Sequence, residues 1–285
     1  MNKLEIALRY QKIYKNWLRV LYDTYKLQKK IKVKLRSGED DTVSYKIAFL
    51  VACSNLLIPA INLLNLAKSD KFLFGGQVIT MHGMEGNGEI PQIFFLESYK
   101  FLDPQGEIVF DVGANIADSA IYFAIKGARR VIALEPSPYA YNFARENVIS
   151  SHLEEKIILL NSGYGIDSEI SVDSNKVTNL GSQIISGPGK IIKIYSLRSL
   201  LGIYRVDSAI LKMDCEGCEY NIIKEERNVL RKFKRIQIEY HYGPEELVDK
   251  LEGCGFDVKF TRPKKIHNQE LNITMAVGFI FAKLL

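Results

Sequence analysis

Two clusters of ionisable side chains stand out in the second half of the chain. Both follow short apolar runs that are typical of buried strands, and together they comprise Asp214, Glu216, Glu219, Glu239 and His241. Because parallel strands present their carboxyl ends at one edge of a sheet, we expect the two clusters to lie close together there. Carboxylates beside an imidazole can bind hydroxyl groups, accept a proton or hold a divalent cation.

We predict Asp214, Glu216, Glu239 and His241 as catalytic residues. His241 suits proton acceptance because the ordinary pKa of an imidazole is about 6.5, and Asp214 or Glu239 would orient it or bind the acceptor. A simpler interpretation is that the acidic residues only cap the helix that follows. A cation held by Asp214, Glu216 and Glu239 is a further alternative, but it is not favoured, and we predict no metal ligand.

A cofactor would have to be positioned by VFDVGANIADSAIYFA, residues 109–124. An apolar strand ends in Asp111, a Gly-Ala-Asn turn follows, and helical spacing then begins. Asp118 or Ser119 is predicted to cap the start of the helix, and Gly127 to end it. This strand–turn–helix unit is typical of ligand binding in open α/β sheets.

The next strand ends in Glu135, about twenty residues after the turn, where an acidic side chain binds ribose hydroxyls in nucleotide-binding sheets. Such a site suits a dinucleotide or an adenosine-type cofactor. The predicted cofactor-binding residues are Asp111, Gly113, Ala114, Asn115, Ser119 and Glu135.

Charge distinguishes between the two cofactor types. Asp111 and Asp118 flank the turn, and the GxGxxG glycines of a pyrophosphate-binding turn are missing. Like charges a few ångström apart repel by a few kcal/mol near a protein surface, so phosphate is disfavoured. S-adenosyl-L-methionine carries no phosphate, and its ammonium and sulfonium groups are cationic. The acidic turn therefore favours S-adenosyl-L-methionine.

These segments resemble the Rossmann-like S-adenosylmethionine-dependent methyltransferases, and within them the FkbM type. The resemblance rests on FDVGANIADSAIYFA, VIALEPSPYAYNFARENV and LKMDCEGCEYNII and covers roughly residues 95–285. The first block is common to many methyltransferases, whereas the DxEGxE block at 214–219 is more particular to the FkbM type. The chain departs from the family at Ala117, where a glycine is usual.

The resemblance implies an α/β fold whose sheet is mostly parallel, with an antiparallel last strand and helices on both sides. It divides the chain into an accessory segment, 1–95, and a methyltransferase domain, 96–285. It implies O-methylation of a hydroxyl on a small-molecule or glycan acceptor. Ser162 and Tyr164 occupy positions where this fold usually surrounds the adenine.

The net charge of +5 is concentrated at the start of the chain. Residues 1–46 hold twelve Lys and Arg against five Asp and Glu, a net charge of +7. Helical spacing runs from Leu4 to Leu27, and Lys30 to Lys46 is predicted as a hairpin. This basic arm is either a solvated surface or a contact for anionic lipid, glycan or nucleic acid, and peripheral membrane contact is one such role.

The uncharged run at 47–67 is long enough to suggest a membrane span. Ser54, Asn55, Asn62 and Asn65 form one polar stripe, however, and Pro59 interrupts the run. The sequence therefore predicts an amphipathic helix or helix pair, and since no secretory pattern precedes it, a cytoplasmic protein.

Cys215 and Cys218 form an isolated CxxC, for which we predict neither a metal site nor a disulfide. We predict one helix from Gly217 to Leu230.

Two other functions remain open. The basic arm would suit an RNA-binding methyltransferase, although no NPPY-type motif or aromatic-basic interleaving supports it. A non-catalytic partner protein that keeps the cofactor pocket is the other, and Ala117 is the feature that suggests it.

Overall fold

The computed structural model describes residues 3–53, 62, 70–83, 90–172, 189–268 and 273–285. They form two compact units, Met1–Ser98 and Tyr99–Leu285. The sequence placed the division after residue 95.

The described part of the first unit contains helices and two hairpins. Its elements are α1 (Lys3–Ile13), α2 (Trp17–Tyr25), β1 (Ile31–Lys34), β2 (Asp40–Val43), α3 (Tyr45–Cys53), β3 (Lys71–Phe74), β4 (Gln77–Thr80) and the short π-helix η1 (Pro91–Phe95). The predicted hairpin within 30–46 is confirmed, since β1 and β2 pair antiparallel.

The helical stretch predicted from Leu4 to Leu27 is broken into α1 and α2. Asn16 lies at the break, where its side-chain amide donates to the Lys32 carbonyl at 2.9 Å and accepts from the Lys34 amide at 2.9 Å. The break lets Asn16 pair with strand β1, so side-chain to backbone hydrogen bonding outweighs helical continuity here.

The uncharged run at 47–67 is only partly described. Its first seven residues belong to α3, where the Tyr14 hydroxyl donates to the Ala48 carbonyl at 2.8 Å, and residues 54–61 and 63–67 lie outside the described chain. None of the described helices is both long and apolar enough to span a membrane.

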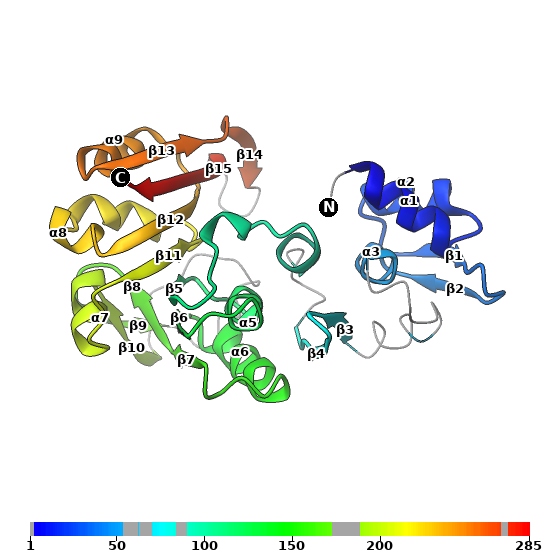
Figure 1. The fold of residues 1–285 in the computed structure, drawn as a ribbon, viewed down its shortest axis with the longest axis horizontal. Coiled ribbons are helices and arrows are strands. Elements are labelled where there is room, and N and C mark those ends of the chain that lie inside the picture. The colour runs from blue at the N-terminus through cyan, green and yellow to red at the C-terminus, as the bar shows by residue number, and fades with distance from the viewer. Residues whose placement is uncertain (1–2, 54–61, 63–69, 84–89, 173–188, 269–272) are drawn as a thin grey trace. The chain divides into compact units, whose positions relative to one another are not determined.

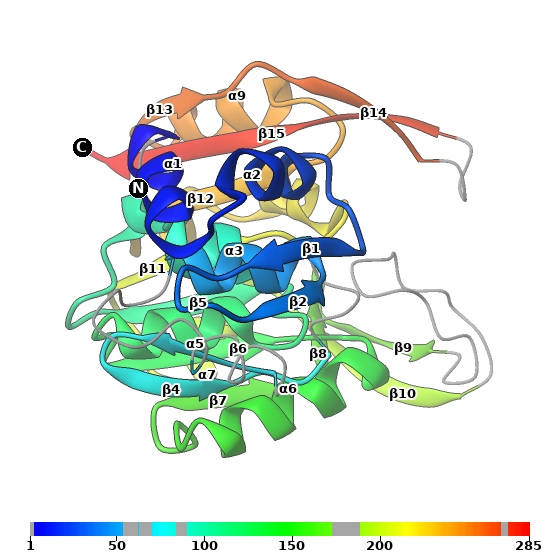
Figure 2. The same cartoon turned by 90° about the vertical axis from the view of Figure 1, so that its right-hand side faces the viewer.

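The second unit is built on one large sheet in the order β13-β15-β12-β11-β5-β6-β7. Strands β5, β6, β7, β11 and β12 are parallel, and β15 lies antiparallel between β12 and β13 (Figures 1 and 2). The predicted fold class is confirmed. The strands are β5 (Ile108–Val112), β6 (Arg130–Leu134), β7 (Ile157–Leu160), β11 (Ala209–Met213), β12 (Phe233–Tyr240), β13 (Phe256–Phe260) and β15 (Ile273–Leu284).

Strand order reverses beside β5. The chain passes from β5 outward through β6 to β7 and then returns to the other side of β5 as β11. Ligands of open α/β sheets bind at this kind of reversal, outside the carboxyl ends of the strands. The predicted cofactor turn follows β5 and the DxEGxE block follows β11, so the topology brings them together.

Helices cover both faces of this sheet, as Figure 1 shows. α5 (Asp118–Ile125) and α6 (Pro138–Ser150) lie on one face; α7 (Leu197–Ile203), α8 (Arg227–Leu230) and α9 (Glu245–Gly253) lie on the other. Strand side chains alternate between these faces. Alternate positions such as Phe110, Val112, Leu211 and Met213 pack in one core with residues of α7, α8 and α9.

Smaller elements complete the second unit. β14 (Lys264–Asn268) extends β15 as a hairpin, and η2 (Lys100–Leu102) precedes the large sheet. β8 (Ser162–Tyr164), β9 (Ser168–Val172) and β10 (Lys190–Tyr195) form a separate sheet in the order β8-β10-β9.

The helix predicted from Gly217 to Leu230 is wrong in one respect, because it is interrupted at Glu225. A 3₁₀ helix, η3 (Cys218–Lys224), precedes the interruption, and α8 follows it. Glu225 is extended there, and its buried carboxylate accepts from the Leu197 amide at 2.7 Å, at the start of α7. Glu225 thus binds a free amide at the start of α7 from an extended backbone conformation, which interrupts the predicted helix.

A buried ion pair joins the two central strands on the face opposite this core. The Lys212 ammonium of β11 lies 3.1 Å from Asp111 of β5, and both side chains are at most 2% exposed. Lys212 also donates to the Gly113 carbonyl at 2.8 Å and lies 5.7 Å from the centre of the Tyr99 ring, while Ser119 of α5 donates to Asp111 at 2.6 Å. The pair therefore links β5, β11, α5 and the turn.

Replacing Lys212 with Met is expected to destabilise the protein by roughly 3–5 kcal/mol, because the Asp111 carboxylate would remain buried without a counter-charge. Denaturant unfolding measures the change. Lys234→Met, which removes an exposed ion pair with Glu107, should cost no more than about 1 kcal/mol. Adding Asp111→Asn to Lys212→Met should recover part of the loss; equal stabilities of the two lysine variants would contradict this account.

Candidate cofactor and acceptor site

The turn after β5 is a left-handed backbone path that only some of its residues favour. Gly113, Asn115 and Ala117 have φ angles of 77°, 49° and 67°. The Gly113 and Ala114 amides both donate to the Leu134 carbonyl of β6, at 3.0 and 2.9 Å. Ala117 is the first flanking residue of α5, so the predicted caps Asp118 and Ser119 instead lie inside the helix.

Ala117 retains the geometry for which the family's usual glycine is suited. The left-handed conformation costs an alanine roughly 1–2 kcal/mol. Gly127, with a φ of 93°, follows the end of α5 as predicted.

Glu135 is held at the end of β6 by backbone donors. Its two carboxylate oxygens accept from the Asn115 amide and the Ser137 amide, each at 2.8 Å. Burial raises the pKa of Glu135 to about 7, although these two hydrogen bonds oppose the rise. The carboxylate is therefore fixed between the turn and the start of α6, and each of its oxygens keeps capacity to accept a further hydrogen bond.

Two buried polar atoms near the Glu135 carboxylate lack a hydrogen-bond partner among the described residues. They are the side-chain oxygens of Asn115 and Ser162. Buried polar groups are normally paired, so both are suited to a bound ligand. An adenosine-type cofactor with an ammonium group fits a site that offers an unpaired amide oxygen and a carboxylate for ribose.

The electrostatic premise drawn from the sequence is wrong for Asp111. Lys212 compensates its charge, and Ser119 binds its second oxygen, so Asp111 and Ser119 support the turn from beneath. Asp118 is also buried, and burial raises its pKa to about 6, with the Lys212 charge acting against the rise. The described turn is therefore much less negative than two free carboxylates would make it.

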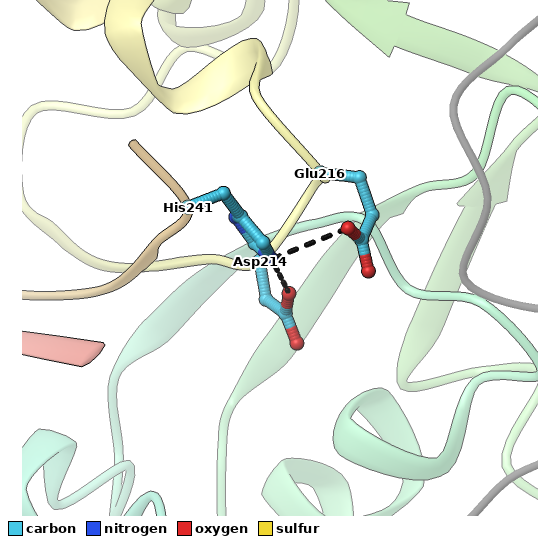
Figure 3. A group of neighbouring side chains, drawn as sticks. All are labelled: Asp214, Glu216 and His241. Atoms are coloured by element: carbon cyan, nitrogen blue, oxygen red, sulfur yellow. Dashed lines mark ion pairs between the residues drawn. The ribbon is translucent and has the colours of Figure 1, made fainter. Parts of the chain in front are cut away.

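The second group of predicted residues meets at the carboxyl ends of β11 and β12. Asp214 immediately follows β11, and His241 immediately follows β12. The His241 Nε2 atom lies 3.4 Å from a Glu216 oxygen and 4.0 Å from an Asp214 oxygen (Figure 3). The expectation that the two strand ends lie close together is confirmed for these three side chains.

His241 is oriented from its other side by Glu219. The fully buried Glu219 carboxylate lies 2.9 Å from the His241 Nδ1 atom and accepts from the His241 amide at 3.1 Å. Its second oxygen accepts from the Gly217 amide at 2.8 Å. Glu219 was not among the predicted catalytic residues, because its position two residues after a turn glycine gives no indication of this contact.

The ionisable groups of this edge perturb one another. Burial alone would lower the pKa of His241, but the bond to Glu219 and the nearby carboxylates raise it to about 9. Burial raises the pKa of Glu239 to about 8, helped by the Asp214 charge, and raises that of Glu216 to about 6. The surrounding carboxylates therefore favour the protonated form of His241, whereas its predicted role as a proton acceptor requires the neutral form.

The prediction for the CxxC pair is also wrong. Cys215 and Cys218 form a disulfide, with their Cα atoms 5.4 Å apart. The bridge closes the short loop that carries Glu216 and Gly217, which have φ angles of 55° and 113°. A loop of this kind presents Glu216 beside Asp214, where a continuous helix would not.

The cofactor turn and the acidic edge share a backbone contact. The Asp214 amide donates to the Val112 carbonyl at 3.1 Å. A methyl group at Gly113 would lie 1.8 Å from the Asp214 carbonyl oxygen, which is closer than atoms can approach. The turn therefore reaches the Asp214 backbone only because residue 113 is glycine.

Comparison with known proteins agrees with this architecture. The model of the methyltransferase FkbM domain matches residues 111–258. Hexuronic acid methyltransferase AglP of Haloferax volcanii is 25% identical over 55% of this chain and 66% of its own length. A tRNA(Phe) (4-demethylwyosine(37)-C(7)) aminocarboxypropyltransferase of Pyrococcus horikoshii is 26% identical over 62% of this chain and 63% of its own length.

Solved structures with related folds include methyltransferase FkbM from Methylobacillus flagellatus KT, with a TM-score of 0.41 and 17% identity over 62% of this chain and 43% of that one. An rRNA methylase from Streptococcus thermophilus has a TM-score of 0.41 and 15% identity over 66% of this chain and 95% of that one.

The family model covers more than half of the 285 residues, and the chain therefore belongs to the FkbM methyltransferase domain family. It therefore carries the S-adenosylmethionine-dependent methyltransferase domain that the sequence predicted, and it spans slightly less than two thirds of the length of the two relatives named above.

Gly113→Ala is expected to destabilise the protein by about 1–3 kcal/mol, because the added methyl group must displace the Asp214 carbonyl. It should also weaken S-adenosylhomocysteine binding, measured by calorimetry. Gly202→Ala is the matched control, since a methyl group there meets no atom within 4 Å. Equal affinities in the two variants would show that the turn does not depend on this contact.

Proposed function

We propose that the protein transfers the methyl group of S-adenosyl-L-methionine to a hydroxyl oxygen of a small-molecule or glycan acceptor. The observation that carries this proposal is the close approach of the Gly113 and Asp214 backbones. It places the turn that binds the Glu135 carboxylate beside the sheet edge that contains Asp214, Glu216 and His241. Methyl transfer requires little more than a nucleophilic oxygen held in line with the donor's sulfur. The hexuronic acid methyltransferase relative supports a glycan-type acceptor.

Each group has a defined task in this scheme. The bound cofactor supplies an electrophilic methyl group. Glu135 accepts hydrogen bonds from the ribose hydroxyls, and the unpaired Asn115 oxygen accepts from the donor's ammonium. Asp111 and Ser119 act as positioning residues through Lys212 and α5. Asp214, Glu216 and Glu239 accept hydrogen bonds from acceptor hydroxyls, and His241 lies beside Asp214 and Glu216 at the same edge.

A second candidate is methylation of RNA. The net charge of +7 in residues 1–46 favours it, and the names of two similar proteins refer to tRNA and rRNA. Binding to RNA through such a surface would weaken steeply as salt is raised, whereas binding of a neutral sugar would not.

Incubation with methyl-labelled S-adenosyl-L-methionine tests the acceptor. We expect label to enter a panel of hydroxylated acceptors that includes uronic acid glycosides, and Glu216→Gln to lower the rate at least tenfold. Transfer of label only to a tRNA or rRNA transcript would establish the second candidate instead. No transfer to any acceptor, together with tight cofactor binding, would identify a non-catalytic binding protein.

Glu135→Gln is expected to weaken S-adenosylhomocysteine binding about 10- to 100-fold, since charge-assisted hydrogen bonds to ribose are lost. In the parent protein, affinity should fall up to about tenfold between pH 8 and pH 6. The pKa of Glu135 is raised to about 7, so the carboxyl gains a proton over this range and loses accepting capacity.

Calorimetry at several pH values measures this dependence, which should be absent in Glu135→Gln. The exposed Glu154→Gln serves as control and should keep both the affinity and the pH dependence. Unchanged affinity in Glu135→Gln would exclude the assigned ribose contact.

A further inference from the structure

The three side chains of Figure 3 have the geometry of a metal-ligand set. One oxygen of Asp214, one oxygen of Glu216 and the Nε2 atom of His241 all lie within 4.8 Å of one another. Atoms that bind one ion at about 2.1 Å stand roughly 3.0–4.2 Å apart, depending on the angle between the bonds. The separations of 3.4 and 4.0 Å from Nε2 fall within that range.

Glu216 is the most exposed of the three side chains. Its side chain is 33% exposed, whereas the side chains of Asp214 and His241 are 13% and 5% exposed. Asp214 and His241 therefore lie on the buried side of the group, and Glu216 lies on the solvent side.

His241 is held as metal-binding histidines usually are. Ligating imidazoles commonly donate their second ring nitrogen to a carboxylate, which fixes the ring orientation. Glu219 provides that carboxylate at Nδ1, and the amides of Gly217 and His241 fix Glu219 in turn. This leaves Nε2 directed at Asp214 and Glu216, from a side chain that is nearly fully buried.

Carboxylates outnumber cationic groups at this edge. Asp214, Glu216 and Glu219 place three carboxyl groups around the single imidazole of His241. The nearby ammonium of Lys212 is already paired with Asp111 at 3.1 Å. A divalent cation would offset the mutual repulsion of these groups.

We propose that Asp214, Glu216 and His241 bind one divalent cation, with Glu219 orienting His241 behind it. Two carboxylates with one imidazole suit Mn²⁺ or Zn²⁺ better than the all-oxygen sites typical of Mg²⁺ and Ca²⁺. This proposal differs from the expectation that the chain holds no metal ligand, and from the alternative set of the sequence analysis it keeps Asp214 and Glu216 and takes His241 in place of Glu239.

The role of the ion rests on the proposed O-methyl transfer. A hydroxyl that binds a divalent cation loses its proton more readily, so a neutral sugar hydroxyl becomes a better nucleophile. The hydroxyl proton passes to water, the new oxygen–methyl bond forms as the sulfur–methyl bond breaks, and the donor leaves as S-adenosylhomocysteine.

Mn²⁺ titration of the full chain tests the site directly. After dialysis against EDTA, the protein should bind one Mn²⁺ per chain by calorimetry, with a matching loss of the free-ion signal in electron paramagnetic resonance. Zn²⁺ should compete. Glu216→Gln, which alters the most exposed ligand, should weaken binding at least tenfold, and Glu219→Gln about 10- to 100-fold. The exposed Glu252→Gln of α9 is the control and should bind as the parent does.

Two results would overturn the proposal: no Mn²⁺ or Zn²⁺ binding at millimolar concentration, or equal binding in the parent, Glu216→Gln and Glu219→Gln proteins. S-adenosylhomocysteine binding, measured with and without the ion, separates this outcome from failure of the proposed function. If the metal-free protein binds S-adenosylhomocysteine and methylates hydroxyls in EDTA, the proposed role of the cation is refuted and the proposed function stands. A protein that binds Mn²⁺ but methylates no hydroxyl refutes the proposed function and leaves the cation site intact.

Discussion

The buried ion pair between Asp111 and Lys212 is the interaction on which the rest of the site depends. It lies between the two strands where the sheet reverses direction, and the Lys212 ammonium also binds the carbonyl of Gly113. An isolated charge at this depth would be strongly unfavourable, so each partner constrains the other. The pair thereby links the Gly113 turn, where we propose that the cofactor binds, to the strand that precedes Asp214.

That arrangement explains why a single glycine matters so much at residue 113. Cofactor turn and acidic edge are contributed by strands that are neighbours in the sheet but about a hundred residues apart in the chain. Their backbones approach directly, with no side chain between them. In the proposed function, donor and acceptor are therefore brought together by sheet topology.

Elements with a local or periodic sequence pattern could be predicted, whereas contacts between residues that are distant in the chain could not. Strand–turn–helix spacing predicted β5, the turn and α5, and the strand ends of β11 and β12 could be located from their apolar runs. The pairing of Lys212 with Asp111 spans 101 positions and leaves no periodic trace. The break at Glu225 also depends on a residue distant in the chain, since the Glu225 carboxylate accepts from the Leu197 amide at the start of α7.

Asp214 and His241 stand one position beyond the last residue of their strands, and the loop between Asp214 and Glu219 is closed by its own disulfide. Both residues therefore lie beyond the paired strand residues. Substitution of their side chains can change which groups are offered at this edge while the pairing of the strands is kept. Diversification of substrates within one scaffold is the expected result of such a separation.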